Sequence, residues 1–364
     1  MEEMNTVLRS FTMHQVDRSA VVDKIAGEHF SFKVTPHMVS ALEQGMVAGV
    51  PGAFEAFCRA FVPSRLESSR IDDPNSGVDC IGEEWPEASP VSAITNFYRS
   101  RVLFRITTIC PAYCRYCFRR RMVGDGIGAW DEHKIEEGLR YIRGNTEIKE
   151  VILSGGDPFT ISDARLSTVL VALREIPHVR RIRIDTKALT MLPQRLTDST
   201  VSLLRQSQPL YIIGHFTHPH ELSIETRKAC SMLIDAGVPV RSHTPLLKGI
   251  NDDEATLASL MEQLVDLRIQ PYYLIHFIPT RWSEHHRVPI TRGLQLVQYL
   301  QRQCGGIATP TYIVYLPDAG GKVPVSPQYI RERTADGYLF ENLEGRLILY
   351  PEPSGGPHDG QRNE

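Results

Sequence analysis

The chain has 364 residues, of which 42% are hydrophobic, and its 40 basic and 43 acidic residues leave a formal net charge of -3. This length predicts one large domain with smaller pieces at its ends, and the near balance of charge favours neither nucleic acid nor an anionic membrane as a partner. The N-terminus lacks the pattern of a signal peptide, and no run of about 18 apolar residues is present, so we expect a cytoplasmic protein without a membrane span.

Residues 1–95 predict a helical and irregular N-terminal region. Residues 36–64 have the apolar spacing of helices, with a break at Pro51-Gly52. Residues 65–95 are rich in Pro, Asp, Ser and Gly and predict an irregular segment that wraps the next domain, whereas residues 1–27 show only weak patterning.

From about residue 100, short runs rich in β-branched residues alternate with longer amphipathic runs. The strand-like runs are 102–107, 150–154, 181–185, 210–215, 238–243 and 270–276. The helix-like runs are 132–144, 162–175, 195–206, 221–236, 253–268 and 291–303. Such alternation is typical of an α/β protein with a parallel sheet, and six units predict a partial (β/α)6 barrel over residues 96–305. In barrels of this kind the carboxyl ends of the strands carry the chemistry.

Residues 306–352 predict a small C-terminal extension, with short strand-like runs at 311–315 and 347–350. Residues 353–364 are polar and rich in Gly, which is typical of a disordered tail. The sequence contains no internal repeat and no long low-complexity tract.

Three of the seven cysteines, Cys110, Cys114 and Cys117, lie within eight residues, in a loop after the first predicted barrel strand. In a chain without an export signal, this clustering favours metal binding over disulfides. Three thiolates on one short loop can bind three irons of a 4Fe–4S cluster and leave the fourth iron open for a chelating ligand such as S-adenosylmethionine (SAM). The alternative is zinc, which normally takes four protein ligands, and no fourth Cys or His lies at a suitable local spacing.

The second predicted strand ends in LSGGDPF. Gly155 and Gly156 permit a close backbone approach at the mouth of the barrel, and Asp157 can accept a hydrogen bond from an ammonium group, although such a turn is by itself usually only a turn. His215 ends the fourth predicted strand, where a histidine is either a ligand contact or a satisfied core residue.

Several long segments resemble the lysine 2,3-aminomutase family, and they occur in the family's order over about residues 30–352. They are CRYCFRRRMVG, LSGGDPF, HFTHPHE, DAGVPVRSHTPLLKGIND, QPYYL and DAGGKVPVSPQYI. The resemblance implies a radical SAM enzyme that uses a 4Fe–4S cluster, SAM and pyridoxal 5′-phosphate (PLP). It also implies an isomerase that moves an amino group between adjacent carbons of an amino acid, with the Gly-Gly-Asp turn holding the methionyl amino group of SAM.

The resemblance places the PLP-binding lysine at Lys322, in the C-terminal extension. A Schiff base to PLP needs a partly desolvated amine with a lowered pKa, whereas the alternative is a solvated lysine in a Gly-rich turn. By similarity, Arg101 pairs with the PLP phosphate and Tyr98 packs near the cofactor. The family's first phosphate-binding arginine falls on Phe97 here, so Arg99 or Arg105 could compensate; the neighbouring polar positions of the family correspond to Ser242 and His243.

The resemblance also assigns substrate contacts. Arg119 matches the residue that holds the substrate carboxylate, while Arg120 and Arg121 could equally be structural ion-pair partners. Lysine-specific members hold the ε-ammonium group with two aspartates, whose equivalents here are Ile278 and Tyr315. An unpaired buried ammonium group costs several kcal/mol, so free lysine is not the expected substrate.

Other charged residues are open as partners of the substrate side chain. Asp185 or Asp318 could serve a cationic side chain, and Lys187 or Arg281 an anionic one. We therefore rank arginine slightly ahead of acidic or neutral amino acids.

Two alternatives to an aminomutase are another SAM- and PLP-dependent conversion and a non-catalytic iron–sulfur protein. Retention of Lys322, Arg119 and the Gly-Gly-Asp turn argues against the second, because a binding module needs none of them. The resemblance implies an amino-acid substrate, an external electron donor such as flavodoxin or ferredoxin, and a homo-oligomer. The chain lacks the C-terminal cysteine cluster with which some members bind structural zinc, so we expect no zinc.

Overall fold

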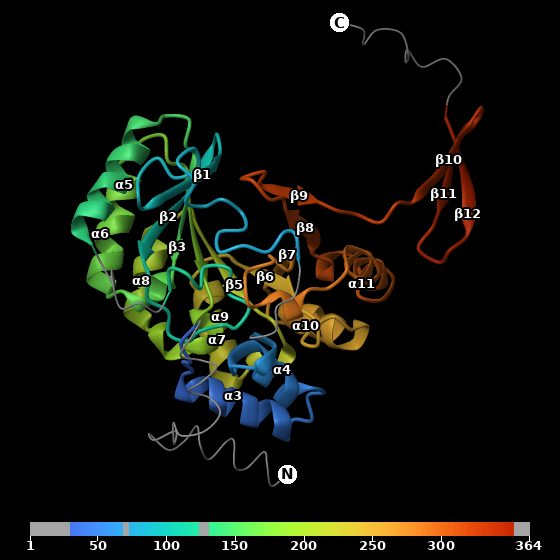
Figure 1. Ribbon diagram of the computed structural model, residues 1–364, viewed down its shortest axis with the longest axis horizontal. Coiled ribbons are helices and arrows are strands. Elements are labelled where there is room, and N and C mark those ends of the chain that lie inside the picture. Colours follow the sequence, from blue (N-terminus) through green and yellow to red (C-terminus); the bar gives the residue numbers. More distant parts are fainter. Residues whose placement is uncertain (1–29, 68–72, 124–130, 353–364) are drawn as a thin grey trace, which may run out of the picture.

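A curled sheet of nine strands, in the order β1 to β9, forms the centre of the computed structural model (Figure 1). The structure describes residues 30–67, 73–123 and 131–352, so the expectations for residues 1–27 and 353–364 lie outside the described residues. The strands are β1 (Ile94–Tyr98), β2 (Arg101–Thr107), β3 (Glu150–Gly155), β4 (Arg181–Thr186), β5 (Leu210–His215), β6 (Val240–Leu246), β7 (Gln270–His276), β8 (Thr311–Tyr315) and β9 (Lys322–Pro324).

Strands β2 to β8 are all parallel, and an antiparallel strand closes each side of the sheet, β1 beside β2 and β9 beside β8. The six predicted strands and the partial barrel are confirmed. Thr311–Tyr315, which was expected in the C-terminal extension, instead pairs with β7 as a seventh parallel strand. The predicted boundary near residue 305 therefore falls inside one continuous sheet.

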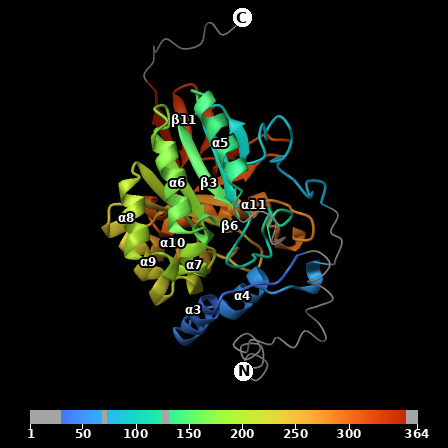
Figure 2. The same ribbon diagram turned by 90° about the vertical axis from the view of Figure 1, so that its left-hand side faces the viewer.

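The helices after each strand cover the outer face of the sheet (Figures 1 and 2). They are α5 (Glu132–Gly144), α6 (Asp163–Arg174), α7 (Ala188–Met191), α8 (Asp198–Gln206), α9 (Ile224–Asp235), α10 (Glu254–Asp266) and α11 (Ile290–Gln303). Helices α5, α6 and α8 to α10 begin after an Asp, Ser or Thr whose side chain accepts a backbone N–H of the first turn. No helix in the described ranges is long and apolar enough to cross a membrane.

The alternation of side chains along each strand separates the core from the interior of the barrel. On β2, Val102, Phe104 and Ile106 are fully buried against the helices, whereas Leu103 faces the inside of the curl. This arrangement follows from the two-residue period of a strand. The interior is therefore free for a site, while the stability of the fold comes from the layer between sheet and helices.

Two N-terminal helices, α3 (Pro36–Val47) and α4 (Ala53–Phe61), pack across one end of the barrel. Their apolar residues form a second core cluster, in which Leu42 and Phe57 lie with Ala112 of the cysteine loop and Leu247 beyond β6. The irregular segment that follows crosses the loop after β7, where Gly77 pairs with Thr280.

Strands β10 (Ile330–Thr334), β11 (Gly337–Glu341) and β12 (Leu347–Pro351) form a separate antiparallel sheet that projects from the barrel (Figure 1). The predicted run at 347–350 is thus the last strand of this sheet. The residues of β12 are exposed.

Candidate functional site

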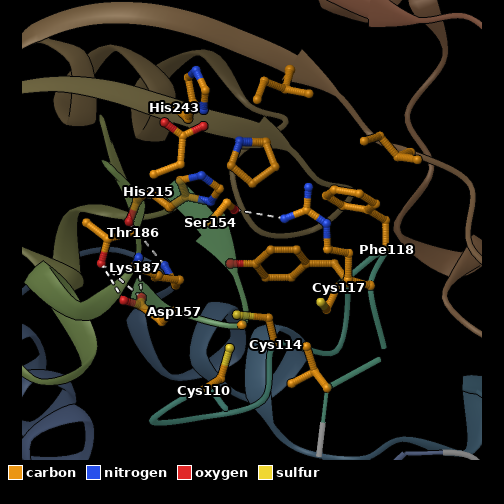
Figure 3. A pocket seen from close by; sticks show the side chains of 18 of the residues that line it. Cys110, Cys114, Cys117, Phe118, Ser154, Asp157, Thr186, Lys187, His215 and His243 are labelled. Carbon is orange, nitrogen blue, oxygen red and sulfur yellow. Dashed lines mark hydrogen bonds between the residues drawn. The ribbon is translucent and has the colours of Figure 1, made fainter. Parts of the chain in front are cut away.

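A cavity lies inside the curl of the sheet, towards the carboxyl ends of the strands (Figure 3). It encloses about 1260 Å³ of space outside the protein atoms, part of it open to solvent. Residues from β2 to β9 and from the cysteine loop line it together. This is the position at which barrels of this kind hold their ligands.

The three cysteines of the loop line one end of this cavity (Figure 3). All three are free thiols and partly exposed. Lys33 donates a hydrogen bond from Nζ to the carbonyl of Cys110 at 2.9 Å, and the N–H of Cys117 donates to the carbonyl of Cys114 at 3.1 Å. Burial raises the pKa of the Cys114 thiol to about 12, so its binding to a metal releases a proton.

The donor set fits an iron–sulfur cluster better than a single metal ion. In the described part of the chain, no three His, Cys, Asp or Glu side chains are arranged to hold one ion. Thiolates that each bind a different iron of a cluster need not converge on one point, whereas the ligands of a zinc ion must. The role of Cys110, Cys114 and Cys117 as ligands of a cluster stays a prediction.

The Gly-Gly-Asp turn at the end of β3 packs against the backbone that enters the cysteine loop. A Cβ atom on Gly155 would lie 2.1 Å from the carbonyl oxygen of Thr107, and one on Gly156 would lie 2.2 Å from that of Ile109. Gly155 also has a φ of +125°, which favours glycine. Both positions require glycine because two strand ends meet there, and the contact fixes the start of the cysteine loop.

The carboxylate of Asp157 is occupied by groups of its own chain (Figure 3). It accepts the backbone N–H groups of Phe159 at 3.0 Å, Lys187 at 2.8 Å and Ala188 at 2.9 Å, and the hydroxyl of Thr186 at 2.8 Å. The side chain therefore holds the turns after β3 and β4. Its contact with a ligand ammonium group stays a prediction.

Lys322 is the first residue of β9 and reaches the cavity from the edge of the sheet. Its Nζ lies 5.4 Å from the ring centroid of Tyr273 and 5.1 Å from that of Tyr315. Burial lowers the pKa of the amine, and the nearby Arg183 lowers it further. The lysine is thus not a solvated loop residue, and it has the desolvated amine that Schiff-base chemistry requires.

The arginines near β1 do not line the cavity, and the pairing of Arg101 with a cofactor phosphate stays a prediction. The Arg101 guanidinium lies 3.8 Å above the Tyr98 ring, and the Tyr98 hydroxyl accepts the backbone N–H of Lys322. Arg99 pairs with Glu147 at 2.8 Å on the surface, and the side chain of Arg105 donates to the carbonyl of Ser92 and to Thr95. Neither Arg99 nor Arg105 lines the cavity, so neither replaces the arginine that is lost at Phe97.

Two histidines face the cavity from neighbouring strands. The ring of His243 stacks on Tyr272 and Tyr273, at centroid distances of 5.7 and 5.5 Å, and its buried Nε2 has no hydrogen-bond partner among the described residues. The ring of His215 lies 5.4 Å from it, and burial lowers the pKa of His215 to about 4, so this imidazole is neutral near pH 7. The buried Nε2 of His243, which has no partner among the described residues, is therefore suited to a hydrogen bond with a polar group of a cofactor.

Ser242 was expected beside His243 at the cofactor, but it does not line the cavity. Adjacent residues of a strand point to opposite faces. Because His243 faces the cavity, Ser242 faces the helix layer, where it is fully buried and does not line the cavity.

Arg119 lines the cavity and is held by Glu83 and Ser154, with a longer bond of 3.5 Å from Nη1 to the Gly155 carbonyl. Its guanidinium donates to the carboxylate of Glu83, at 2.9 Å from Nε and 2.6 Å from Nη2. Its Nη1 donates to the hydroxyl of Ser154 at 2.9 Å (dashed in Figure 3). No pattern in the sequence indicated Glu83, because it lies in an irregular segment without periodicity.

The next two arginines are ion-pair partners within the protein. Arg120 pairs with Glu67 at 3.5 Å, and Arg121 pairs with Glu84 at 2.9 Å. Of the two roles considered for Arg120 and Arg121, the structure therefore agrees with that of ion-pair partners.

The residues expected at the substrate side chain divide into two groups. Ile278, Tyr315 and Asp185 line the cavity, and both carboxylate oxygens of Asp185 accept from Nη2 of Arg183 at 3.1 Å. Asp318 and Arg281 are exposed and do not line it. Lys187 lines the cavity, but its Nζ donates to Glu221 at 2.7 Å and to Thr217 at 3.2 Å. Asp185 is therefore the one acid among these candidates that faces the cavity.

Comparison with known proteins gives two family matches. The Radical SAM superfamily matches residues 104–261, and the family described as Lysine-2,3-aminomutase matches residues 297–362. The radical SAM match contains the cysteine loop, and the second match contains Lys322.

Several curated proteins are similar over most of the chain. An L-lysine 2,3-aminomutase from Acetoanaerobium sticklandii is 38% identical over 88% of this chain and 75% of its own length. A glutamate 2,3-aminomutase from Clostridioides difficile is 33% identical over 95% of this chain and 79% of its own. An L-lysine 2,3-aminomutase from Fusobacterium nucleatum is 39% identical over 75% of this chain, and the match spans only 64% of that protein.

Proposed function

Because the chain belongs to the lysine 2,3-aminomutase family of radical SAM enzymes, we propose that it moves an amino group between the α- and β-carbons of an amino acid. One observation carries this proposal. Lys322 is far along the sequence from the cysteine loop and its neighbour Arg119, yet all of them line one cavity. A protein that only carried electrons or metal would need neither the desolvated amine of Lys322 nor an arginine held in place as Arg119 is.

The family uses a 4Fe–4S cluster, SAM and PLP, and the lining residues suit each group. We assign the cluster to Cys110, Cys114 and Cys117. When bound, the cluster and SAM supply an electron and a carbon radical, and PLP supplies a conjugated system that delocalises an unpaired electron.

Two further groups of residues are assigned to the organic cofactors. We assign SAM to the neighbourhood of Gly155, Gly156, Asp157 and His215, which line the cavity next to the cysteines. We assign PLP to Lys322, His243, Tyr98 and Arg101, a set that joins a desolvated amine, an orphaned ring nitrogen and an arginine.

The chain's own residues position the substrate and exclude water. The amine of Lys322, whose pKa burial lowers, provides the attachment point for the cofactor, and the guanidinium of Arg119 offers N–H donors to a carboxylate. The walls of the cavity are mainly apolar and aromatic, and Phe277 and Ile278 are among the residues that line it. A reactive radical survives only where water and other side chains are kept away from it.

The substrate that we propose is an amino acid other than lysine. Ile278 and Tyr315 offer no anion to an ε-ammonium group, and an unpaired buried charge is strongly disfavoured. Arginine is the first candidate, because Asp185 lines the cavity and its charge suits a guanidinium group.

An acidic amino acid is the second candidate substrate. Asp185 already shares its charge with Arg183, and the relative from Clostridioides difficile, a glutamate 2,3-aminomutase, aligns with 95% of this chain. We also propose that an external donor such as flavodoxin or ferredoxin supplies the electron and that the protein forms a homo-oligomer.

The test is an anaerobic incubation of the loaded enzyme with dithionite and SAM, with one L-amino acid in each reaction. Mass spectrometry with chiral separation then identifies β-amino acids, and matched reactions without SAM serve as controls. We expect a SAM-dependent β-isomer of arginine or of an acidic amino acid. A different SAM-dependent product would show another radical conversion, and fastest turnover of lysine would refute the substrate argument.

A further inference from the structure

Glu83 is a charged residue with no assigned role, and it lies behind the cavity wall. Its side chain is 2% exposed, although it belongs to the irregular segment before β1. Burial opposes ionisation of this carboxyl, but Arg119, followed by Arg105 and Arg121, holds its pKa below the usual value. Glu83 is therefore a buried carboxylate that Arg119 contacts through two nitrogens.

The hydrogen bonds of Arg119 leave a defined part of its guanidinium free. Of its five N–H donors, Glu83 takes one on Nε and one on Nη2, while Nη1 donates to Ser154 at 2.9 Å and, by a long bond of 3.5 Å, to the Gly155 carbonyl. One donor on Nη2 remains, and the Nη1 donor on Gly155 is held only weakly because hydrogen bonds weaken beyond about 3.2 Å. Together these two donors match the two oxygens of a carboxylate.

The backbone of Glu83 is itself held in place. The carboxylate of Asp79 accepts the N–H groups of Glu83 at 3.0 Å and Glu84 at 2.8 Å, and the hydroxyl of Thr95 donates to the Glu83 carbonyl at 3.4 Å. The preceding Gly82 packs against the backbone of Ala319, in the loop that leads to Lys322. The same turn thus contacts both Arg119 and the loop before Lys322.

We propose that Glu83 is a positioning residue for the substrate carboxylate. It fixes the rotation of the Arg119 guanidinium, so that the remaining Nη2 donor and the weakly held Nη1 donor are available to a carboxylate before the substrate arrives. An arginine that is already oriented loses less conformational freedom on binding, which strengthens binding of the carboxylate. This inference rests on the proposed function, in which Arg119 holds the α-carboxylate.

A purely structural ion pair makes a different prediction. If Glu83 served only the fold, its loss would weaken every ligand of the cavity to the same degree. If it positions Arg119, its loss weakens ligands with a carboxylate and spares those without one.

The test compares Glu83→Gln with Glu84→Gln, a neighbouring glutamate that pairs with Arg121 instead of Arg119. The probes are the L-amino acid that binds PLP-loaded wild-type protein most tightly without SAM, and its carboxamide. Binding is read from the change in PLP absorbance, which requires no turnover. For Glu83→Gln we expect at least about tenfold weaker binding of the acid, a change below about twofold for the carboxamide, and a larger effect on KM than on kcat. Glu84→Gln should match the wild type.

Glu83→Gln alone leaves the buried Arg119 charge without its partner and can destabilise the fold. A double-mutant cycle separates this effect from the loss of Arg119 positioning. Arg119→Gln removes the carboxylate contact, and Glu83→Gln in that background should add no further loss of acid binding. Equal weakening of acid and carboxamide by Glu83→Gln, or unchanged acid binding, would overturn the inference while the proposed function stands. Failure of wild-type protein to bind any amino acid would overturn both.

Discussion

The phenolic oxygen of Tyr98 accepts a hydrogen bond from the backbone N–H of Lys322 at 2.8 Å. These residues lie on β1 and β9, the two edge strands of the nine-stranded sheet. The curled sheet is therefore joined at this point by a side chain instead of by strand pairing. The contact places Lys322 over the interior of the barrel, where its amine is desolvated.

Replacement of Tyr98 by Phe should weaken PLP binding about fivefold, since a hydrogen bond of this kind contributes about 1 kcal/mol. The measurement is an equilibrium titration of PLP absorbance. Tyr338→Phe on β11, in the separate sheet, is the matched control and should bind PLP as the wild type does. Unchanged affinity in Tyr98→Phe would show that the edge contact does not position Lys322.

Replacement of Cys110, Cys114 or Cys117 by Ala should remove most of the bound iron and abolish reductive cleavage of SAM. Each thiolate is expected to bind a different iron, so the loss of one exposes the cluster to dissociation. Iron analysis and chromatography of 5′-deoxyadenosine provide the measurement. Cys304→Ala, at the end of α11 and outside the cavity, should retain both iron and activity. Cleavage of SAM by a variant without all three cysteines would refute the cluster assignment.

Borohydride reduction of the PLP-loaded protein should attach a pyridoxyl group to Lys322, and Lys322→Ala should lose this label while it keeps its iron. Because burial lowers the pKa of Lys322, a larger fraction of its amine is neutral at a given pH than for an ordinary lysine. Labelling should therefore persist to lower pH than labelling of exposed lysines. Peptide mapping checks the site, with exposed Lys248→Ala as the control. A label on another lysine would relocate the PLP site.

Replacement of His220 by Gln should flatten the acid side of the stability profile. Burial lowers the pKa of His220 to about 3, below the ordinary value near 6.5. Between these values the unfolded chain binds more protons than the folded one, so the free energy of unfolding falls as the pH falls.

A glutamine cannot bind this proton, so the slope should decrease by up to about 1.4 kcal/mol per pH unit. Urea denaturation at several values between about pH 7 and about pH 4 measures it. Exposed His133→Gln is the control and should keep the wild-type slope. A slope as steep in His220→Gln as in the wild type would contradict the prediction.

The double substitution Ile278→Asp with Tyr315→Asp should raise turnover of lysine relative to the native substrate by about tenfold or more. It supplies two anions to a side-chain pocket that has an aliphatic and a phenolic group in their place. Competition assays with mass spectrometric detection give the ratio directly. Ile307→Asp, at a position that is 73% exposed, controls for the added charge. An unchanged ratio would place the substrate side chain elsewhere in the cavity.

The sequence by itself determined the order and type of the barrel elements. Helix α5 spans the predicted residues 132–144, and β5 and β7 have the predicted bounds. Amphipathic periodicity and strand composition are local properties, so they can be recognised in the sequence alone. The spacing of the three cysteines is local as well, and it predicts a loop that binds an iron–sulfur cluster.

The tertiary structure decided which side chains share the cavity. Glu83, Ser154 and Arg119 come from three separate segments, and no spacing along the chain relates them. Strand period and position settled that Ser242 faces the helices and that Asp318 is exposed. The edge-to-edge contact of Tyr98 and Lys322 exists only because the sheet curls until its first and last strands meet. Contacts of this kind depend on the path of the whole backbone, which a local pattern does not contain.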